Sequence, residues 1–213
     1  MRKRIKRLFD IVFAICISVF VFPVIGISML IVKICSPGAP VIFKQKRIGY
    51  KGKPFMICKL RTMTNDRDKN GELLPDDQRL KPWGKVLRKF SVDELTQIVH
   101  ILSGEMSWIG PRPLLPREMQ VMTKEEQRER QSVMPGITGW EAVNEEKSSD
   151  RRTMAEFDLY YARNWSLRLD AKIFFMTISK LFKADRSDEE HRAPKLKEEE
   201  IISSKNMGVE YNE

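Results

Sequence analysis

The chain has 213 residues, with 38 lysines and arginines against 29 acidic residues, which gives a formal net charge of +9. This length holds one compact domain beside a membrane segment and leaves little room for a second domain. Nine acids and five bases follow residue 183, so residues 1–183 carry +13. The basic part predicts a polyanionic partner: nucleic acid, an anionic membrane or a phosphate-bearing substrate. The three cysteines form no CxxC pair, which argues against a disulfide framework and against zinc.

Residues 1–36 are predicted to enter a membrane. Residues 11–32 contain no charged side chain, and a helix of that length can cross the roughly 30 Å of hydrocarbon in a bilayer. The apolar run is too long for a signal peptide. Pro23 lies in its middle and should bend or break the helix, with Ser18 and Ser28 available to satisfy freed backbone groups. Hydropathy alone also allows a single kinked span, but the basic residues on both flanks favour a re-entrant hairpin with two cytoplasmic ends.

Residues 37–183 predict a small α+β domain that is mostly helical. Residues 40–45 and 54–59 read as the two strands of a β-hairpin, and residues 64–78 as a polar, mobile loop. A capping-box pattern from Ser91 to Glu94 predicts a helix that starts at Ser91 and ends near Gly104.

The second half of that domain is predicted to contain three more helices. The first begins at Pro116 and ends at about Gln131, and a turn-rich connection at 135–139 follows it. The others cover 152–163 and 167–183. The last of them could lie at a membrane interface or pack in the core with a solvated basic face. Residues 184–213 form a polar tail without apolar periodicity, which predicts disorder.

Asp93 and Glu94 are the candidate catalytic pair. They fall in the first turn of the predicted helix, where free N–H groups favour an ionised carboxylate that could attack phosphorus or bind a metal ion. Completion of a helix cap is the structural alternative for this pair. Arg112, held between Pro111 and Pro113, has the geometry to bind phosphate.

The other polar residues of interest are candidate phosphate binders or structural side chains. Arg88 would add positive charge beside the same helix terminus, and Lys59 and Arg61 are further phosphate-binding candidates. The chain contains neither a Walker loop nor a GxG motif. His100 and His191 have no metal-like partners and are assigned to structure or solvent.

Six blocks in order give the chain a resemblance to one known family. They are Lys6-Arg-Leu-Phe-Asp10, Pro40-Val-Ile-Phe-Lys-Gln45 with Arg47 and Gly49, Lys59-Leu-Arg-Thr-Met63, Ser91-Val-Asp-Glu-Leu95, Met106-Ser-Trp-Ile-Gly-Pro-Arg-Pro-Leu114 and Pro135-Gly-Ile-Thr-Gly-Trp140. This ordered set resembles the small monotopic phosphoglycosyl transferases, also called bacterial sugar transferases, over nearly all of residues 4–183.

The resemblance implies an enzyme of the bacterial inner membrane whose catalytic domain lies at the cytoplasmic face. Pro23 would be the membrane break. Asp93 would attack the sugar-bearing phosphorus of a UDP-sugar, release UMP and carry the phosphosugar until undecaprenyl phosphate accepts it. Glu94, with Asp93, would serve as a Mg²⁺ ligand or base, and Arg112 would hold phosphate. Membrane phospholipid would be a further partner, nucleic acid would not, and a homodimer is left open.

The chain departs from this family at two places. Phe22 precedes Pro23 where many relatives have serine, which removes a hydroxyl from the bend. Residues 141–146 read Glu-Ala-Val-Asn-Glu-Glu, where relatives commonly have Ala-Gln-Val-Asn-Gly-Arg, so acids replace an arginine. Lys147, Arg151 or Arg152 could compensate for that lost charge.

Two readings without catalysis compete with this hypothesis. A membrane-tethered basic module that binds anionic lipid or nucleic acid would explain the charge and the anchor, but not the ordered motifs. A family member that has lost activity through the altered 141–146 segment would serve as a scaffold.

Overall fold

The computed structural model describes residues 1–147 and 150–183, so the predicted tail and His191 lie outside the described residues. Within them the chain is mostly helical, as predicted, and contains two small two-stranded sheets, of which the prediction included one. The α-helices and strands, in chain order, are α1 (Arg2–Cys35), β1 (Ile42–Ile48), β2 (Pro54–Leu60), α2 (Asp76–Arg79), α3 (Pro82–Lys89), α4 (Ile98–Ser103), β3 (Ser107–Ile109), α5 (Lys124–Arg130), β4 (Gly136–Thr138), α6 (Trp140–Val143), α7 (Arg151–Asn164) and α8 (Leu167–Lys183). Four short 3-10 helices also occur: η1 (Tyr50–Gly52), η2 (Val92–Gln97), η3 (Pro116–Val121) and η4 (Glu145–Lys147).

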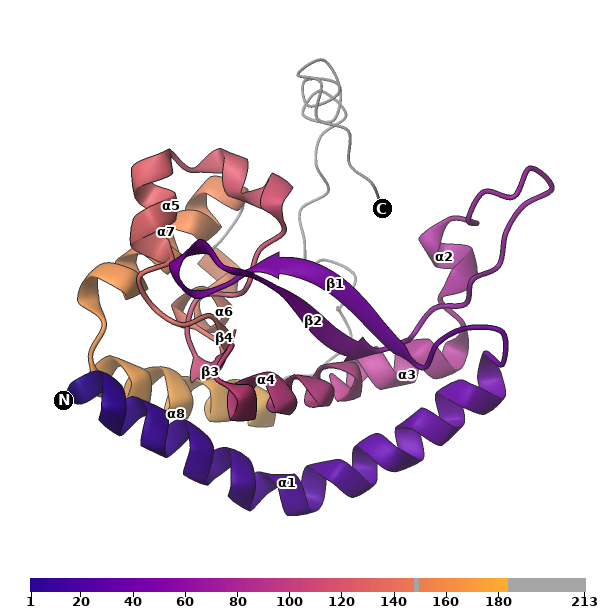
Figure 1. Ribbon diagram of the computed structural model, residues 1–213, viewed down its shortest axis with the longest axis horizontal. Coiled ribbons are helices and arrows are strands. Elements are labelled where there is room, and N and C mark those ends of the chain that lie inside the picture. Colours follow the sequence, from indigo (N-terminus) through magenta and orange to yellow (C-terminus); the bar gives the residue numbers. More distant parts are fainter. Residues whose placement is uncertain (148–149, 184–213) are drawn as a thin grey trace.

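Helix α1 curves along the underside of the domain, below α8, α4 and α3 (Figure 1). It is recorded as one 34-residue helix with Pro23 inside, so two separated helical arms are not seen. The Ser18 hydroxyl donates to the Ala14 carbonyl at 2.6 Å. The carbonyl four residues before Pro23 belongs to Val19, so this bond does not serve the group that the proline frees.

The surface of α1 is reversed relative to a helix of a water-soluble protein. Its buried residues are mostly small or polar, namely Asp10, Ala14, Ser18, Ile25, Ser28 and Val32. Its exposed residues include large apolar side chains such as Val19, Phe20, Ile27, Leu30 and Ile34. A helix with its apolar side chains turned outward suits an apolar solvent, and α1 is long and apolar enough to cross a membrane.

The N-terminal part of α1 is fixed to the domain by polar contacts. The Arg7 guanidinium donates to the carbonyls of Ile101 and Leu102 at 2.5 and 3.0 Å, at the C-terminal end of α4. Lys6 pairs with Asp170 of α8 at 2.8 Å. These contacts tie the N-terminal part of α1 to α4 and α8, so the helix and the domain have a defined relative position.

The predicted β-hairpin is confirmed, with strands that extend slightly beyond the predicted limits. Strands β1 and β2 pair antiparallel, with Ile42 opposite Leu60 and Ile48 opposite Pro54. One face of β2 supplies Phe55 and Ile57 to the core, where they join Ile98 and Ile101 of α4. The hairpin therefore lies above η2 and α4, on the side of the domain opposite to α1 (Figure 1).

Three details of the predicted helices are wrong. Ser91 does not cap a helix, because its φ of 51° is left-handed and its side chain makes no cap bond; the 3-10 helix η2 precedes the short α4 instead. The helix predicted from Pro116 to about Gln131 is split, since Met122 is extended. A capping box formed by Thr123 and Glu126 then starts α5.

The other helix predictions after residue 60 are confirmed, but strands β3 and β4 and helices α3 and α6 were not predicted. Helix α4 ends at Gly104, whose φ of 89° is the left-handed conformation that glycine adopts at helix ends. Helices α7 and α8 match their predicted ranges to within one residue, and the polar loop is irregular until α2 begins. The turn-rich connection at 135–139 contains β4, which pairs parallel with β3, Ser107 opposite Gly136.

Candidate active site

The Asp93-Glu94 pair lies on η2, and side-chain bonds to β2 fix that segment. The Thr96 hydroxyl donates to the Cys58 carbonyl at 2.8 Å, and the Cys58 N–H donates to His100 Nε2 at 3.0 Å. His100 is buried and its Nδ1 contacts the Glu105 carboxylate at 2.7 Å, which confirms its structural assignment. Because the N–H and the carbonyl of Cys58 are both held in this way, the next residue of β2, Lys59, is positioned beside the pair.

Cations surround the Glu94 carboxylate. The Lys59 Nζ lies 2.6 Å from Glu94 Oε1, and both side chains are largely shielded from solvent. The Arg112 Nη2 lies 3.9 Å from the same oxygen. Lys59 and Arg112, predicted from separate motifs, therefore both lie at the Glu94 carboxylate.

The electrostatic setting of Asp93 differs from the sequence prediction. Burial, and then the neighbouring charge of Glu94, raise the pKa of Asp93 above 3.8, although Lys59 and Arg88 act in the opposite direction. The sequence prediction was wrong in direction: a helix start was expected to favour the ionised form of Asp93. Desolvation instead outweighs the stabilising charges and raises the pKa of Asp93. A carboxyl group with a perturbed pKa beside a second acid and two cations is a typical functional arrangement.

The other two predicted phosphate binders on this side have protein partners. Arg88 Nε donates to the Thr62 hydroxyl at 2.8 Å. Helix α3 packs closely on the segment after β2, because a Cβ on Gly84 would lie 1.9 Å from the Thr62 carbonyl. Arg61 donates to the Pro40 carbonyl at 2.6 Å and to Asn65 at 2.7 Å. Arg88 is thus adjacent to Asp93, whereas phosphate binding by Arg61 stays a prediction.

The Arg112 loop is held from below by a buried ion pair. Arg130 bonds Asp158 through Nε at 2.9 Å and Nη2 at 2.6 Å, and the same Nη2 donates to the Arg112 carbonyl at 2.5 Å. Pro111 and Pro113 are buried, while the Arg112 side chain is 54% exposed. The backbone is therefore fixed and the guanidinium points outward, as a phosphate-binding arginine requires.

Close backbone packing completes this loop. Gly110 N–H donates to the Thr138 carbonyl at 2.9 Å, and Gly136 N–H donates to the Pro111 carbonyl at 3.0 Å. A Cβ on Gly110 or Gly136 would lie 2.1 Å from backbone of the opposite segment, so only glycine permits the contact. The sequence analysis missed this pairing, although the density of glycines in both segments was a signal for it.

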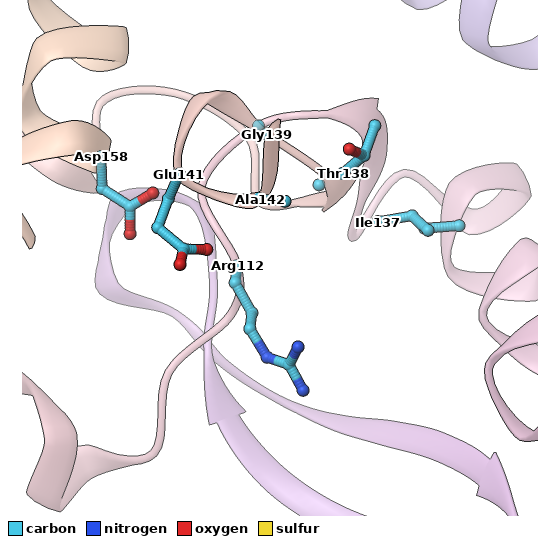
Figure 2. A pocket seen from close by; sticks show the side chains of 9 residues that line it. Arg112, Ile137, Thr138, Gly139, Glu141, Ala142 and Asp158 are labelled. Carbon is cyan, nitrogen blue, oxygen red and sulfur yellow. The ribbon is translucent and has the colours of Figure 1, made fainter. Parts of the chain in front are cut away.

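A small pocket adjoins Arg112 (Figure 2), and its lining includes Thr138, Glu141 and Asp158. Glu141 is the first residue of the altered 141–146 segment, so the departure from the family pattern reaches the site itself. Arg130 and Asp158, which support the site, were missed because a buried ion pair between two helices leaves no local pattern in sequence.

The cations suggested as compensation for the altered segment have acidic partners. Arg151 pairs with Glu118 at 3.2 Å, and Arg152 pairs with Glu126 at 2.7 Å. The Lys147 side chain lies outside the described part of the structure.

The carboxylate pair fits a magnesium ion in a limited sense. Among residues 1–147 and 150–183, no group of three or more His, Cys, Asp or Glu side chains is placed to hold a metal ion. Magnesium, however, is usually held by one or two carboxylates together with water and substrate phosphates. Asp93 and Glu94 supply two such carboxylates, and a cation would relieve the mutual repulsion that raises the pKa of Asp93.

Comparison with known proteins identifies the family of this chain. The bacterial sugar transferase family matches residues 1–184. The chain is 44% identical over 181 residues to the uncharacterized sugar transferase EpsL of Bacillus subtilis, covering 83% of this chain and 87% of that protein. It is 40% identical over 191 residues to the UDP-glucose:undecaprenyl-phosphate glucose-1-phosphate transferase of Escherichia coli, covering 84% of this chain and 40% of that longer protein.

A third relative carries a different sugar in its name. The UDP-N-acetylgalactosamine-undecaprenyl-phosphate N-acetylgalactosaminephosphotransferase of Aeromonas hydrophila is 37% identical over 185 residues, covering 82% of this chain and 43% of that protein. The relatives named for an activity are thus phosphosugar transferases that differ in their sugar. The matched region contains the carboxylate pair, Lys59 and the Arg112 loop, and the chain belongs to the bacterial sugar transferase family.

Proposed function

We propose that the chain transfers a sugar 1-phosphate from a UDP-sugar to undecaprenyl phosphate. The observation that carries this proposal is the meeting of Asp93, Glu94, Lys59 and Arg112 at one site, beside a helix whose exposed face is apolar. Names of relatives support the donor and acceptor classes. Two anionic substrates must approach each other in this reaction, and fixed cations reduce that repulsion.

In the proposed first step, a carboxylate oxygen of Asp93 attacks the sugar-bearing phosphorus of the donor. The bond from that phosphorus to the bridging oxygen breaks, and UMP leaves with the electron pair. In the second step, a phosphate oxygen of the lipid attacks the same phosphorus, the bond to Asp93 breaks, and the carboxylate is regenerated. Lys59 and Arg112 offset the charge on the phosphoryl oxygens. Mg²⁺, held by Glu94 and Asp93, would supply further positive charge when bound.

The lipid acceptor explains the membrane segment. We propose that α1 enters and leaves the inner membrane at its cytoplasmic face, bent at Pro23, so that the site lies near the headgroup plane. Basic flanks and the curvature of α1 support this topology. An active site fixed at that plane gains proximity to a lipid phosphate. A homodimer stays a prediction.

The covalent mechanism is tested without the lipid acceptor. Purified full-length protein with Mg²⁺ and a panel of UDP-sugars should release about one UMP per protein and gain the mass of one phosphosugar. Asp93→Asn should do neither. Absence of both signals for every donor, with well-folded wild-type protein, would contradict the mechanism, and UMP release by Asp93→Asn would remove Asp93 as nucleophile.

The topology is tested with a native thiol. Cys35 is exposed at the end of α1, and Cys16→Ser/Cys58→Ser leaves it as the sole cysteine of the chain. A membrane-impermeant maleimide added to spheroplasts should leave Cys35 unlabelled until the inner membrane is permeabilised. Labelling in intact spheroplasts would favour a single span and would separate this domain from a cytoplasmic donor.

A further inference from the structure

A second group of arginines is built around Glu118, next to the site. The Glu118 carboxylate bridges two of them, with Arg47 Nη1 at 3.0 Å and Arg151 Nη1 at 3.2 Å, and it also accepts from the Leu115 N–H at 2.7 Å. All three charged side chains are at least four-fifths shielded from solvent. The triad thus joins two guanidinium groups through one carboxylate.

Two further arginines act electrostatically on Arg47. Arg112 and Arg117 are exposed, and their charges, after burial, lower the pKa of Arg47. Arg47 Nε is also buried without a hydrogen-bond partner. Arg112 and Arg117 therefore repel the Arg47 guanidinium, and an anion bound to these two exposed groups would offset that repulsion.

The position of this arginine group distinguishes it from the carboxylate pair. Arg47 lies on the same face of the β1–β2 hairpin as Lys59, because Lys59 is opposite Phe43 and residues 43 and 47 share a face. Four residues along a strand span roughly 13 Å, so Arg47 is beside the carboxylate pair and not at it. Arg112 belongs to both places, because it also reaches Glu94 at 3.9 Å.

We propose that the exposed guanidinium groups of Arg112 and Arg117, supported by the Arg47–Glu118–Arg151 triad, form an anion subsite for the nucleotide phosphate of the donor. This inference rests on the proposed function, since UMP is the leaving group there. The phosphate of the lipid has the same chemistry. Figure 1 shows β1 and α7, which carry Arg47 and Arg151, on the side of the domain opposite to α1, which favours the water-soluble substrate.

Arg117→Ala tests the subsite, because Arg117 has no role in the carboxylate pair. Arg128→Ala is the matched control, an exposed arginine of α5 whose loss changes the net charge equally. With full-length protein in nanodiscs, UMP binding measured by calorimetry should weaken about tenfold or more in Arg117→Ala, as for the loss of one charged hydrogen bond. Arg117→Glu should weaken it further, and binding by Arg128→Ala should equal that of wild type.

The two sources of phosphate are separated by the lipid acceptor. In Arg117→Ala, the KM for a short-chain polyprenyl phosphate should be unchanged. A raised lipid KM with unchanged UMP binding would overturn the assignment to the donor, and equal effects of Arg117→Ala and Arg128→Ala would overturn the subsite.

Failure of the proposed function is distinguishable from failure of the subsite. If wild-type protein forms no covalent product and binds no UMP, the proposed function fails. Pyrophosphate is then the probe: binding that Arg117→Ala weakens and Arg128→Ala preserves would still support an anion subsite, and equal binding by all three proteins would overturn it.

Discussion

The buried Arg130–Asp158 pair allows stability and activity to be separated. Both side chains are almost fully shielded, at 3% and 6% exposure, and Arg130 also holds the Arg112 carbonyl. Arg130→Met leaves the Asp158 carboxylate buried without its partner, which typically costs about 3 to 5 kcal/mol. For a chain of this size each kcal/mol shifts Tm by about 2 to 4 °C, so we expect a loss of roughly 6 to 20 °C.

The double variant Arg130→Met/Asp158→Leu removes both charges. Apolar replacements of a buried ion pair are often neutral or stabilising, so most of the lost Tm should return. Activity should not return, because the Arg112 carbonyl still lacks its donor and the phosphate-binding loop is less well fixed. Thermal unfolding and UMP release measured on the same preparations provide the two readouts.

The surface pair of Arg163 and Glu129 is the control. Its side chains are 54% and 38% exposed, so Arg163→Met should cost about 1 kcal/mol or less. A double variant no more stable than Arg130→Met would refute the buried-charge argument. A double variant with wild-type activity would refute the positioning role of Arg130.

Three further changes have defined outcomes. Asp93→Asn should abolish the covalent intermediate and raise Tm at pH 7. Folding raises the pKa of Asp93, so the folded protein binds more protons than the unfolded chain above pH 3.8, and its stability falls as the pH rises through that window. The gain in Tm from Asp93→Asn should therefore shrink as the pH approaches 3.8. Gly84→Ala places a Cβ against the Thr62 carbonyl and should lower both Tm and activity, whereas Gly26→Ala, with no atom within 4 Å, should leave Tm nearly unchanged; equal Tm values would contradict the contact. Lys59→Met should lower the rate of UMP release by about tenfold or more, and an unchanged rate would exclude Lys59 from charge stabilisation.

The raised pKa of Asp93 also has a functional meaning. Burial that disfavours its charge destabilises the folded protein, and a nucleophile gains from reduced solvation when cations are close. Ionised Asp93 is therefore expected to destabilise the folded protein when no cation is bound beside it. Addition of Mg²⁺ with UMP should raise the Tm of wild-type protein, because a ligand that binds only the folded state stabilises it.

Local patterns in the sequence were sufficient for part of this protein. The apolar run of α1, the β1–β2 hairpin, α7 and α8 were predicted because periodicity and turn residues act within a few positions of each other. Asp93, Glu94 and Arg112 were selected from local chemistry and from motifs that resemble one family. Lys59 contacts Glu94 as part of the same site, which its motif alone did not require.

Only the tertiary structure decided the remaining features. Glu94 bonds Lys59, 35 residues away, while the Ser91 N–H that a capping box would use donates to the Arg88 carbonyl at 2.8 Å. Strands β3 and β4 were both missed, since they pair across about 30 residues and three residues are too few to show an alternating pattern. The pKa of Asp93 likewise depends on burial by segments remote in sequence, and desolvation is a property of the packed molecule that no stretch of sequence contains.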